Sequence, residues 1–462
     1  MRHLVLWVVL FAAYVSALGI DAIGGSEYSG GEARLLLTTA SLAADRDADI
    51  SDEHAEPDLS EHIPADLTLY GRLRDGRVHD PQGVGLPALL APAYLAGGPR
   101  TVELVLAALT ALAFTVAAGL ARIVVPDPWA TRGVAVVGLS PPAVAHATAI
   151  HPDAAAALLL AVAVLFAART REEARVPAAA ASALALAGLP WLGPEYAVAG
   201  LPVAAMLVHW TLRQHRRMAT LVAVEIISTS VIAYTALNNL LYGGLTPLAA
   251  DVERVLSPEV ATVGGYLERV PRIAALWLDR DVGLARWAPI LVLSIFGVWL
   301  LWRSHRDGPS RALPARREAE AVAALAVAVG SVQLVIAALL SPGLHETFPG
   351  RHLLAVAPLA AVLVAWAARH LPRIALVLGA LTVGTTVWLV IQLRLGSIGA
   401  WSPPVSSAPW GPLERLLPSY AGASVWADAV SLGLAAVVMT VLAMQWRAAR
   451  QWRQSADVPR RV

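Results

Sequence analysis

Apolar residues in this chain occur in long runs rather than in the short alternating stretches of a soluble protein. Twelve of these runs approach the roughly 20 residues that an α-helix needs to cross the hydrocarbon core of a bilayer. The pattern therefore predicts an all-α polytopic membrane protein with about 12 transmembrane helices. The predicted spans are 4–22, 101–122, 130–149, 153–169, 177–192, 196–212, 218–240, 285–303, 319–341, 352–368, 374–393 and 425–446.

Composition agrees with this reading and excludes several classes of protein. Of the 462 residues, 57% are hydrophobic and only 15% are charged, against about 25% charged residues in a typical soluble domain. The formal net charge of +1 supplies no basic field, so nucleic acid is not an expected partner. The absence of cysteine excludes disulfides and thiol catalysis.

Arginine is concentrated on alternate loops of the predicted topology. All 35 basic residues are arginine, and most lie at the N-terminus, around 123–129, or in 169–175, 213–217, 303–318, 369–373 and the C-terminal tail. The opposite side carries the long loops 23–100, 241–284 and 394–424. Short loops rich in arginine stay in the cytoplasm. We therefore expect one transmembrane domain over 1–446, a first outer loop over 23–100, a cytoplasmic tail over 447–462, and both termini inside.

The first outer loop has two apolar segments of its own. Residues 31–44 have the spacing of an amphipathic juxtamembrane helix, with Leu35, Leu36, Thr39 and Leu42 towards lipid or core. Residues 84–97 are apolar but short and contain two prolines, which predicts a re-entrant or interfacial piece.

Acidic residues alternate along the segment after the predicted helix 31–44. Asp45, Asp47 and Asp49 are spaced as in a calcium loop, but the glycine and distal glutamate of an EF-hand are missing. A solvated acidic face is the favoured interpretation.

Two further acids are candidates for catalysis. Glu32 opens the predicted helix at the membrane surface, and Asp153 follows Pro152 in the first turn of another predicted helix. A carboxylate at either place is also explained by the helix dipole alone. Since both lie on the same predicted side, the pair is a candidate for holding a divalent cation or for supplying a general base.

The basic candidates lie on the outer side as well. Arg351 and His352 stand at the outer start of a predicted span, against the orientation bias of arginine, and binding of a phosphate would explain them. His79 is a candidate phosphate or metal ligand, although an isolated loop histidine more often only makes a local hydrogen bond. Arg280, between two aspartates, is expected to pair with them.

Several motifs resemble those of polytopic glycosyltransferases of the GT-C fold, related to protein O-mannosyltransferases and lipid A aminoarabinose transferases. That family has a Gly-Asp-Glu-Pro-His-Tyr motif soon after its first span, then a "SL..DGDLDL" stretch and a "HxPGLP" stretch. The matching segments here are 30–34, 41–50 and 79–87, with further similarity at 151–153, 189–192, 239–243, 279–284 and 350–353.

The resemblance implies a polyprenyl-phosphate sugar as donor, an acceptor in the outer space, and a place in the plasma membrane of a prokaryote. It implies that the acid of the first loop, Glu32, with Asp153, supplies a catalytic base or part of a metal-assisted site. If the protein is such an enzyme, we expect Arg351, His79 and His352 to neutralise the donor phosphate. The family's aspartate is Gly31 here, and its Pro-His-Tyr is Ala33-Arg34-Leu35. A non-catalytic protein that binds or transports a lipid-linked sugar, or a structural membrane subunit, are the alternatives.

Topology can be tested by cysteine labelling, because the chain has no native cysteine. We expect Asp58→Cys to react with an impermeant maleimide in intact cells, and His215→Cys to react only after permeabilisation. Labelling of position 58 only after permeabilisation would overturn the orientation.

Overall fold

The fold is an array of helices with one small pair of strands. The computed structural model describes residues 2–20, 27–55, 64, 67, 69, 73–74, 77–172, 175–250, 263–304, 314–341, 348–397, 409, 417–420, 424–434, 436 and 440. The strands β1 (Leu73–Arg74) and β2 (Arg77–Val78) are antiparallel, with Leu73 opposite Val78. The all-α prediction is therefore confirmed for the described part of the chain.

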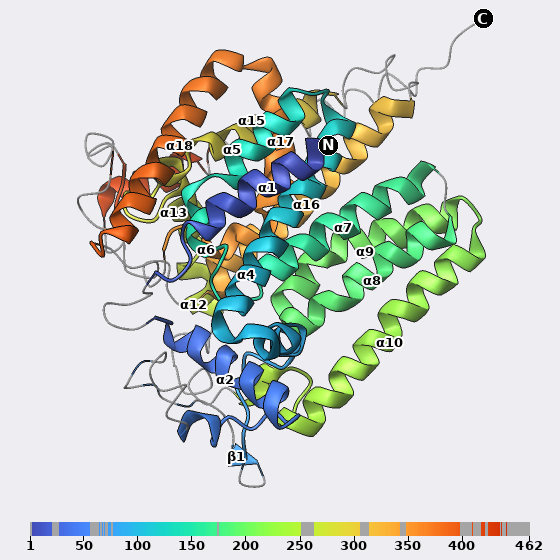
Figure 1. The fold of residues 1–462 in the computed structure, drawn as a ribbon. Helices are drawn as coiled ribbons and strands as arrows, with labels where there is room; N and C mark the ends of the chain where they lie inside the picture. Colours follow the sequence, from blue (N-terminus) through green and yellow to red (C-terminus); the bar gives the residue numbers. More distant parts are fainter. Residues whose placement is uncertain are drawn as a thin grey trace, which may run out of the picture.

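The helices follow one another along the whole sequence (Figure 1). The α-helices are α1 (Arg2–Val15), α2 (Gly30–Ala44), α4 (Gly85–Val124), α5 (Trp129–Gly138), α6 (Pro141–His146), α7 (Asp153–Glu172), α8 (Val176–Leu192), α9 (Pro194–Arg213), α10 (Arg217–Tyr242), α12 (Val263–Glu268), α13 (Arg272–Leu278), α14 (Leu284–Trp287), α15 (Val292–Ser304), α16 (Pro314–Leu340), α17 (Ala357–His370) and α18 (Pro372–Arg394). Short 3-10 helices are η1 (Glu53–Ala55), η2 (Pro247–Ala250), η4 (Pro289–Leu291) and η6 (Arg351–Val356).

Six helical segments in the described residues are long and apolar enough to cross a membrane. They are Gly85–Val124, Asp153–Arg171, Arg217–Ala250, Glu318–Leu340, Arg351–His370 and Pro372–Arg394. Shorter apolar helices occur at Arg2–Val15, Val176–Leu192, Pro289–Arg303 and Val425–Leu434. The chain is thus an integral membrane protein, while the number of 12 spans stays a prediction.

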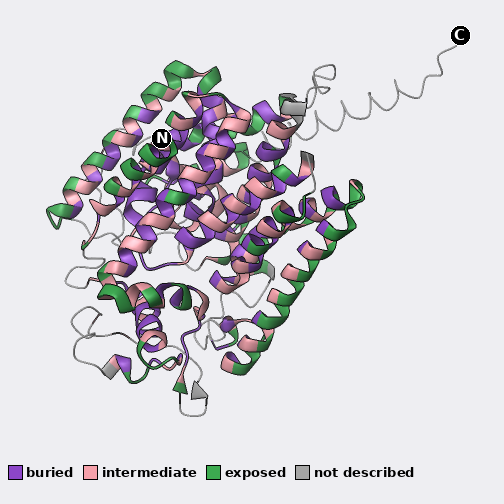
Figure 2. Ribbon diagram, turned by 45° about the vertical axis from the view of Figure 1, so that its right-hand side comes forward, coloured by how far each residue is buried: buried purple, intermediate pink, exposed green. Residues whose placement is uncertain are grey.

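The outer surface of the helix array agrees with a lipid environment. Figure 2 shows a buried centre and an exposed outer side along α10. Large apolar side chains are exposed there, for example Leu221 at 62% and Ile232 at 67%, and Leu376 on α18 is 76% exposed. Exposed apolar surface of this extent is typical of contact with lipid or a partner.

Two predicted spans are broken helices. The span predicted at 130–149 is α5 followed by α6, because the chain leaves the helix at Ser140 before two prolines. Side chains from other helices satisfy the freed carbonyls: the Tyr14 hydroxyl donates to Gly138 O at 2.9 Å, and the Thr386 hydroxyl donates to Leu139 O at 2.6 Å. Backbone can leave the helix at membrane depth only with such partners.

The second break replaces the single span predicted at 285–303. It is divided into α14, η4 and α15, with Pro289 at the interruption. The Ile290 amide donates to the Thr382 hydroxyl at 3.1 Å. The apolar run therefore predicted the position of this segment in the chain but not the interruption within it.

The segment predicted as an interfacial piece at 84–97 is the first part of α4. The helix is interrupted at Gly97 and Gly98, and Gly98 has φ 66°, a left-handed conformation that glycine adopts without strain. Pro99 follows directly. The kink separates a short helix beside the first outer loop from the long apolar helix that continues to Val124.

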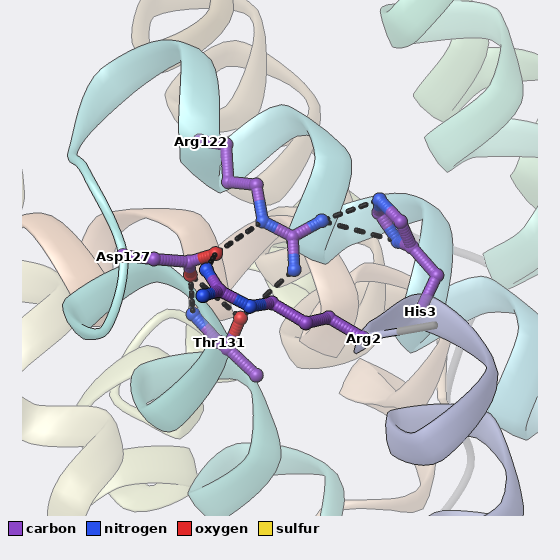
Figure 3. Close-up of polar contacts among 5 residues, drawn as sticks. All are labelled: Arg2, His3, Arg122, Asp127 and Thr131. Atoms are coloured by element: carbon purple, nitrogen blue, oxygen red, sulfur yellow. Dashed lines mark hydrogen bonds and ion pairs between the residues drawn. The ribbon is translucent and has the colours of Figure 1, made fainter.

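A polar cluster fastens α1 at the end of the molecule opposite α2 (Figures 1 and 3). The Asp127 carboxylate accepts from Arg122 Nε at 2.9 Å and from the Thr131 hydroxyl at 2.6 Å, while Arg2 Nη1 lies 3.4 Å away. These contacts, the Thr131 hydroxyl first and Arg122 after it, lower the pKa of Asp127 to about 2. The start of α1 is therefore held against the connection between α4 and α5.

Candidate functional site

The helix predicted at 31–44 exists, but it does not lie on a surface. In α2 the side chains of Leu35, Leu36 and Thr39 are buried, as are most of their neighbours, and Leu42 is half-buried. The helix is therefore packed into the protein on nearly all sides. Its first turn carries Glu32, which is only 3% exposed.

A capping box holds Glu32 at the start of α2. The Ser29 hydroxyl accepts from the Glu32 amide at 3.4 Å, and Glu32 Oε2 accepts from the Ser29 amide at 3.0 Å and from its hydroxyl at 2.8 Å. A reciprocal pair of this kind satisfies amides that the first helical turn leaves free. The local sequence Ser-Gly-Gly-Glu thus fixes the carboxylate before any distant residue is involved.

The other oxygen of Glu32 reaches a distant segment. Its Oε1 accepts a hydrogen bond from the Ile150 amide at 3.0 Å, across 118 residues. Ile150 directly precedes His151-Pro152-Asp153. This bond therefore brings the first outer loop against the turn that begins α7, as expected if Glu32 and Asp153 lie on the same side.

Asp153 is the first residue of α7 and is 7% exposed. Its Oδ1 accepts from the Tyr196 hydroxyl of α9 at 2.8 Å. Tyr196 is itself buried, so both groups of this hydrogen bond lie inside the protein. The bond orients one oxygen of Asp153.

Arg351 reaches the same turn from a third segment. Its Nη2 lies 3.0 Å from His151 Nδ1. Because a guanidinium only donates, His151 Nδ1 is the acceptor and the proton of a neutral ring is on Nε2. Burial lowers the pKa of His151 well below its usual value, and the charge of Arg351 lowers it further. The imidazole is therefore neutral.

Gly350 forms the turn that directly precedes Arg351. Gly350 has φ 85°, and a Cβ added there would lie 2.8 Å from side-chain atoms of Pro142. Nearby, His146 Nε2 lies 3.2 Å from Phe348 O, and the His352 carbonyl accepts from Gln333. Only glycine suits position 350, and the residues on both sides of it are anchored.

Residues 79–83 also contact the start of α2. Arg34 Nε lies 3.5 Å from Asp80 Oδ1, and Gln82 Nε2 donates to Gly31 O at 3.0 Å. His79 is 7% exposed, with Nδ1 2.9 Å from Ala48 O and its ring edge-on to Tyr242. Its described contacts are thus with the first outer loop and with the end of α10, and its role in binding phosphate stays a prediction.

A small cavity opens beside Glu32. Its walls include Glu27, Tyr28, Glu103 and Thr148. The Tyr28 hydroxyl donates to Glu103 Oε1 at 2.6 Å, and Arg100 pairs with both Glu27 and Glu103. Sequence reasoning missed Glu103, although a carboxylate inside the predicted span 101–122 was the available signal.

The environment of Glu32 favours its protonated form more than water does. Burial raises the pKa of its carboxyl, while the hydrogen bonds from Ser29 and Ile150 and the charge of Arg351 oppose the rise. A carboxylate with a raised pKa is a stronger base. The same contacts also hold the first turn of α2 in place.

A cation between Glu32 and Asp153 would share the Glu32 oxygens with hydrogen-bond donors of the protein. The described partners of the Glu32 oxygens are backbone and hydroxyl donors, and a positive guanidinium already contacts His151 Nδ1. Positive charge beside this turn comes from Arg351. A divalent cation between Glu32 and Asp153 stays a prediction.

The comparisons with known proteins give structural likeness only. No protein-family model and no curated protein matches the sequence. Solved structures of the oligosaccharyltransferase AglB from Archaeoglobus fulgidus are similar over 90% of this chain. The complex with an inhibitory peptide and a dolichol-phosphate has a TM-score of 0.45 at 12% identity, and the complex with Zn and sulfate has 0.46 at 11%.

The apo form of that oligosaccharyltransferase has a TM-score of 0.46 at 14% identity. This chain spans 60% of the length of the apo and peptide-bound structures and 58% of the length of the Zn complex.

Proposed function

We propose that this protein is a membrane glycosyltransferase of the GT-C type. It would move a sugar from a polyprenyl-phosphate donor to an acceptor on the outer face of a prokaryotic plasma membrane. The observation that carries the proposal is the meeting of three distant segments: Glu32 contacts Ile150, and Arg351 contacts His151. The turn at 150–153 therefore connects the buried acids Glu32 and Asp153 with the positively charged Arg351.

The charges suit a direct displacement at the sugar. Glu32 in its ionised form takes the proton from an acceptor hydroxyl, and that oxygen forms a bond to the anomeric carbon. The bond from this carbon to the phosphate oxygen breaks, and the polyprenyl phosphate leaves with the electron pair. Attack opposite the leaving group inverts the anomeric configuration.

Arg351 is the proposed partner of the leaving phosphate. Its guanidinium is planar and always charged, and such a fork binds phosphate better than a point charge does. The neutral His151 accepts a hydrogen bond from one nitrogen of this guanidinium and so orients it. His352 and His79 are proposed to assist.

A second candidate function is a non-catalytic protein that binds a lipid-linked sugar, or a transporter for it. The specific observation in its favour is Gly31, which stands where the resembled family has an aspartate. Against a transporter, the polar candidates gather beside the first outer loop rather than at mid-membrane, where transporter sites are usual. Transfer activity distinguishes the candidates.

The role of Glu32 is tested with a pair of variants. Glu32→Gln keeps the shape and can still accept hydrogen bonds, but it cannot take a proton, so turnover should fall about 10²-fold or more. Ser29→Ala removes the helix cap and leaves the acid, so it should cost about 1 kcal/mol of stability with turnover largely retained. The measurements are transfer from a polyprenyl-phosphate sugar and a thermal melt in detergent.

Full turnover in Glu32→Gln would remove Glu32 from catalysis. If Ser29→Ala lost turnover as fully as Glu32→Gln while remaining folded, the position of α2 rather than the proton transfer would be the essential property. Loss of ionised Glu32 should also lower wild-type turnover as pH falls, since its carboxylate form is the base.

Arg351 is tested through donor binding. Arg351→Ala should weaken binding of the polyprenyl-phosphate donor, and Arg351→Lys should restore only part of it because the planar fork is lost. Isothermal titration with the donor measures both. Unchanged donor affinity in the two variants would assign Arg351 to local structure.

Position 31 offers a gain-of-function test. A Cβ added to Gly31 would lie 3.5 Å from His151 Cε1 and 3.9 Å from Gln82 Nε2, which is ordinary van der Waals contact. Gly31→Asp should therefore fold and place a second carboxylate beside His151. We expect its turnover to equal or exceed that of the wild type, with Gly31→Asn as the uncharged control. A folded Gly31→Asp that loses all turnover would contradict the proposed correspondence with the family motif.

A further inference from the structure

The segment that follows α2 divides its acidic residues into two groups. Asp47 and Asp49 stabilise turns: Asp47 Oδ1 accepts from the Ser41 hydroxyl at 2.9 Å, and Asp49 Oδ1 accepts from Ser51 and from the Val78 amide at 2.9 Å. The alternating acids read from the sequence are therefore not ligands of one ion. The remaining acids, Asp45, Asp52 and Glu53, behave differently.

These three acids converge. One carboxylate oxygen from each of Asp45, Asp52 and Glu53 lies within 4.8 Å of the other two. Among the described residues no ion pair joins any of them to an arginine. Three like charges at this separation repel one another unless a proton or a cation is shared.

Glu53 is the unusual member of the group. It is only 3% exposed, and neither of its carboxylate oxygens has a hydrogen-bond partner in the described structure. Burial of an unpaired carboxylate is costly, so such groups keep a proton or bind a metal. Burial, and after it the neighbouring Asp52, raise the pKa of Glu53 to about 8.

We propose that Asp45, Asp52 and Glu53 form a Ca²⁺ site. Ca²⁺ takes 6–8 oxygen ligands at about 2.3–2.6 Å, so ligands on opposite sides of the ion lie roughly 5 Å apart. Oxygens that all lie within 4.8 Å of one another are close enough to bind one ion. Mg²⁺ usually keeps several waters and is bound by one or two carboxylates, so three carboxylates suit Ca²⁺ better. Asp45 and Asp52 are exposed, which leaves room for water to complete the coordination.

The site would brace the outer loop next to Glu32. Asp45 caps the end of α2, and Glu53 begins η1. Between them, the Ile50 amide donates to Val78 O at 3.1 Å, and Ala48 O contacts His79. A cation joining Asp45 to Glu53 would therefore hold the loop on which residues 79–83 rest. This inference does not depend on the proposed transfer reaction.

The test is Ca²⁺ binding by the full chain in detergent after treatment with EDTA. We expect isothermal titration to give a Kd in the range of about 10⁻⁴–10⁻³ M, typical of extracellular calcium modules, with Ca²⁺ raising the melting temperature more than Mg²⁺.

Glu53→Gln is the decisive variant, because it removes the charge of the buried ligand and keeps the shape of its side chain. We expect its Ca²⁺ affinity to fall at least 10-fold and the thermal shift to disappear. Asp281→Asn, in a different loop, is the matched control and should bind as the wild type does. If Glu53→Gln failed to fold, the exposed Asp52→Asn would report the same loss.

No saturable binding by the wild type, or equal affinity in Glu53→Gln and the wild type, would overturn the site. Loss of binding in Asp281→Asn would show that the measured ion lies elsewhere. Loss of sugar transfer with Ca²⁺ binding intact would contradict only the proposed function.

Discussion

The hydrogen bond from the Ile150 amide to Glu32 Oε1 is the constraint on which the rest of the site depends. A buried carboxylate has to find its partners within the protein, and Glu32 finds two at its own helix cap and the third 118 residues later. This bond fixes the direction of α2 against the turn before α7. His151 then follows, and through it Arg351, so three segments remote in sequence share one small region.

Interruptions in the helices also help to bring remote segments together at this site. The helix break at Ser140 and the turn at Gly350, which precedes η6, lie in contact with each other. Tyr14 and Thr386 satisfy the carbonyls beside the break, and Gly350 packs against Pro142 so closely that a side chain would not fit. The prolines and glycines that interrupt these apolar runs are therefore part of the architecture that holds Arg351.

The pattern of apolar residues predicted the long regular helices but not the breaks within them. The segments at 153–169, 218–240 and 374–393 correspond to α7, α10 and α18 within a few residues, because an apolar run of span length has few alternatives to a helix. The breaks within 130–149 and 285–303 were not predicted. The length of an apolar run does not show where a helix is interrupted when distant hydroxyls bond the freed backbone groups. Glu32 and Asp153 could be selected as acids expected on one side. The contact between His151 and Arg351 could not, because nothing in either local sequence specifies a partner 200 residues away.

Glu32 has to satisfy a structural and a chemical role with the same four lone-pair positions of a carboxylate. Among the described residues, two donors from Ser29 occupy Oε2 and one donor from Ile150 occupies part of Oε1. The remaining capacity is thus on Oε1, the oxygen bonded to the turn before α7. Glu32 also lines the cavity with Thr148 and Ala149 of that turn. An acceptor hydroxyl that reached Glu32 through this cavity would meet Oε1, and the Ile150 amide would stabilise the charge until the proton is taken.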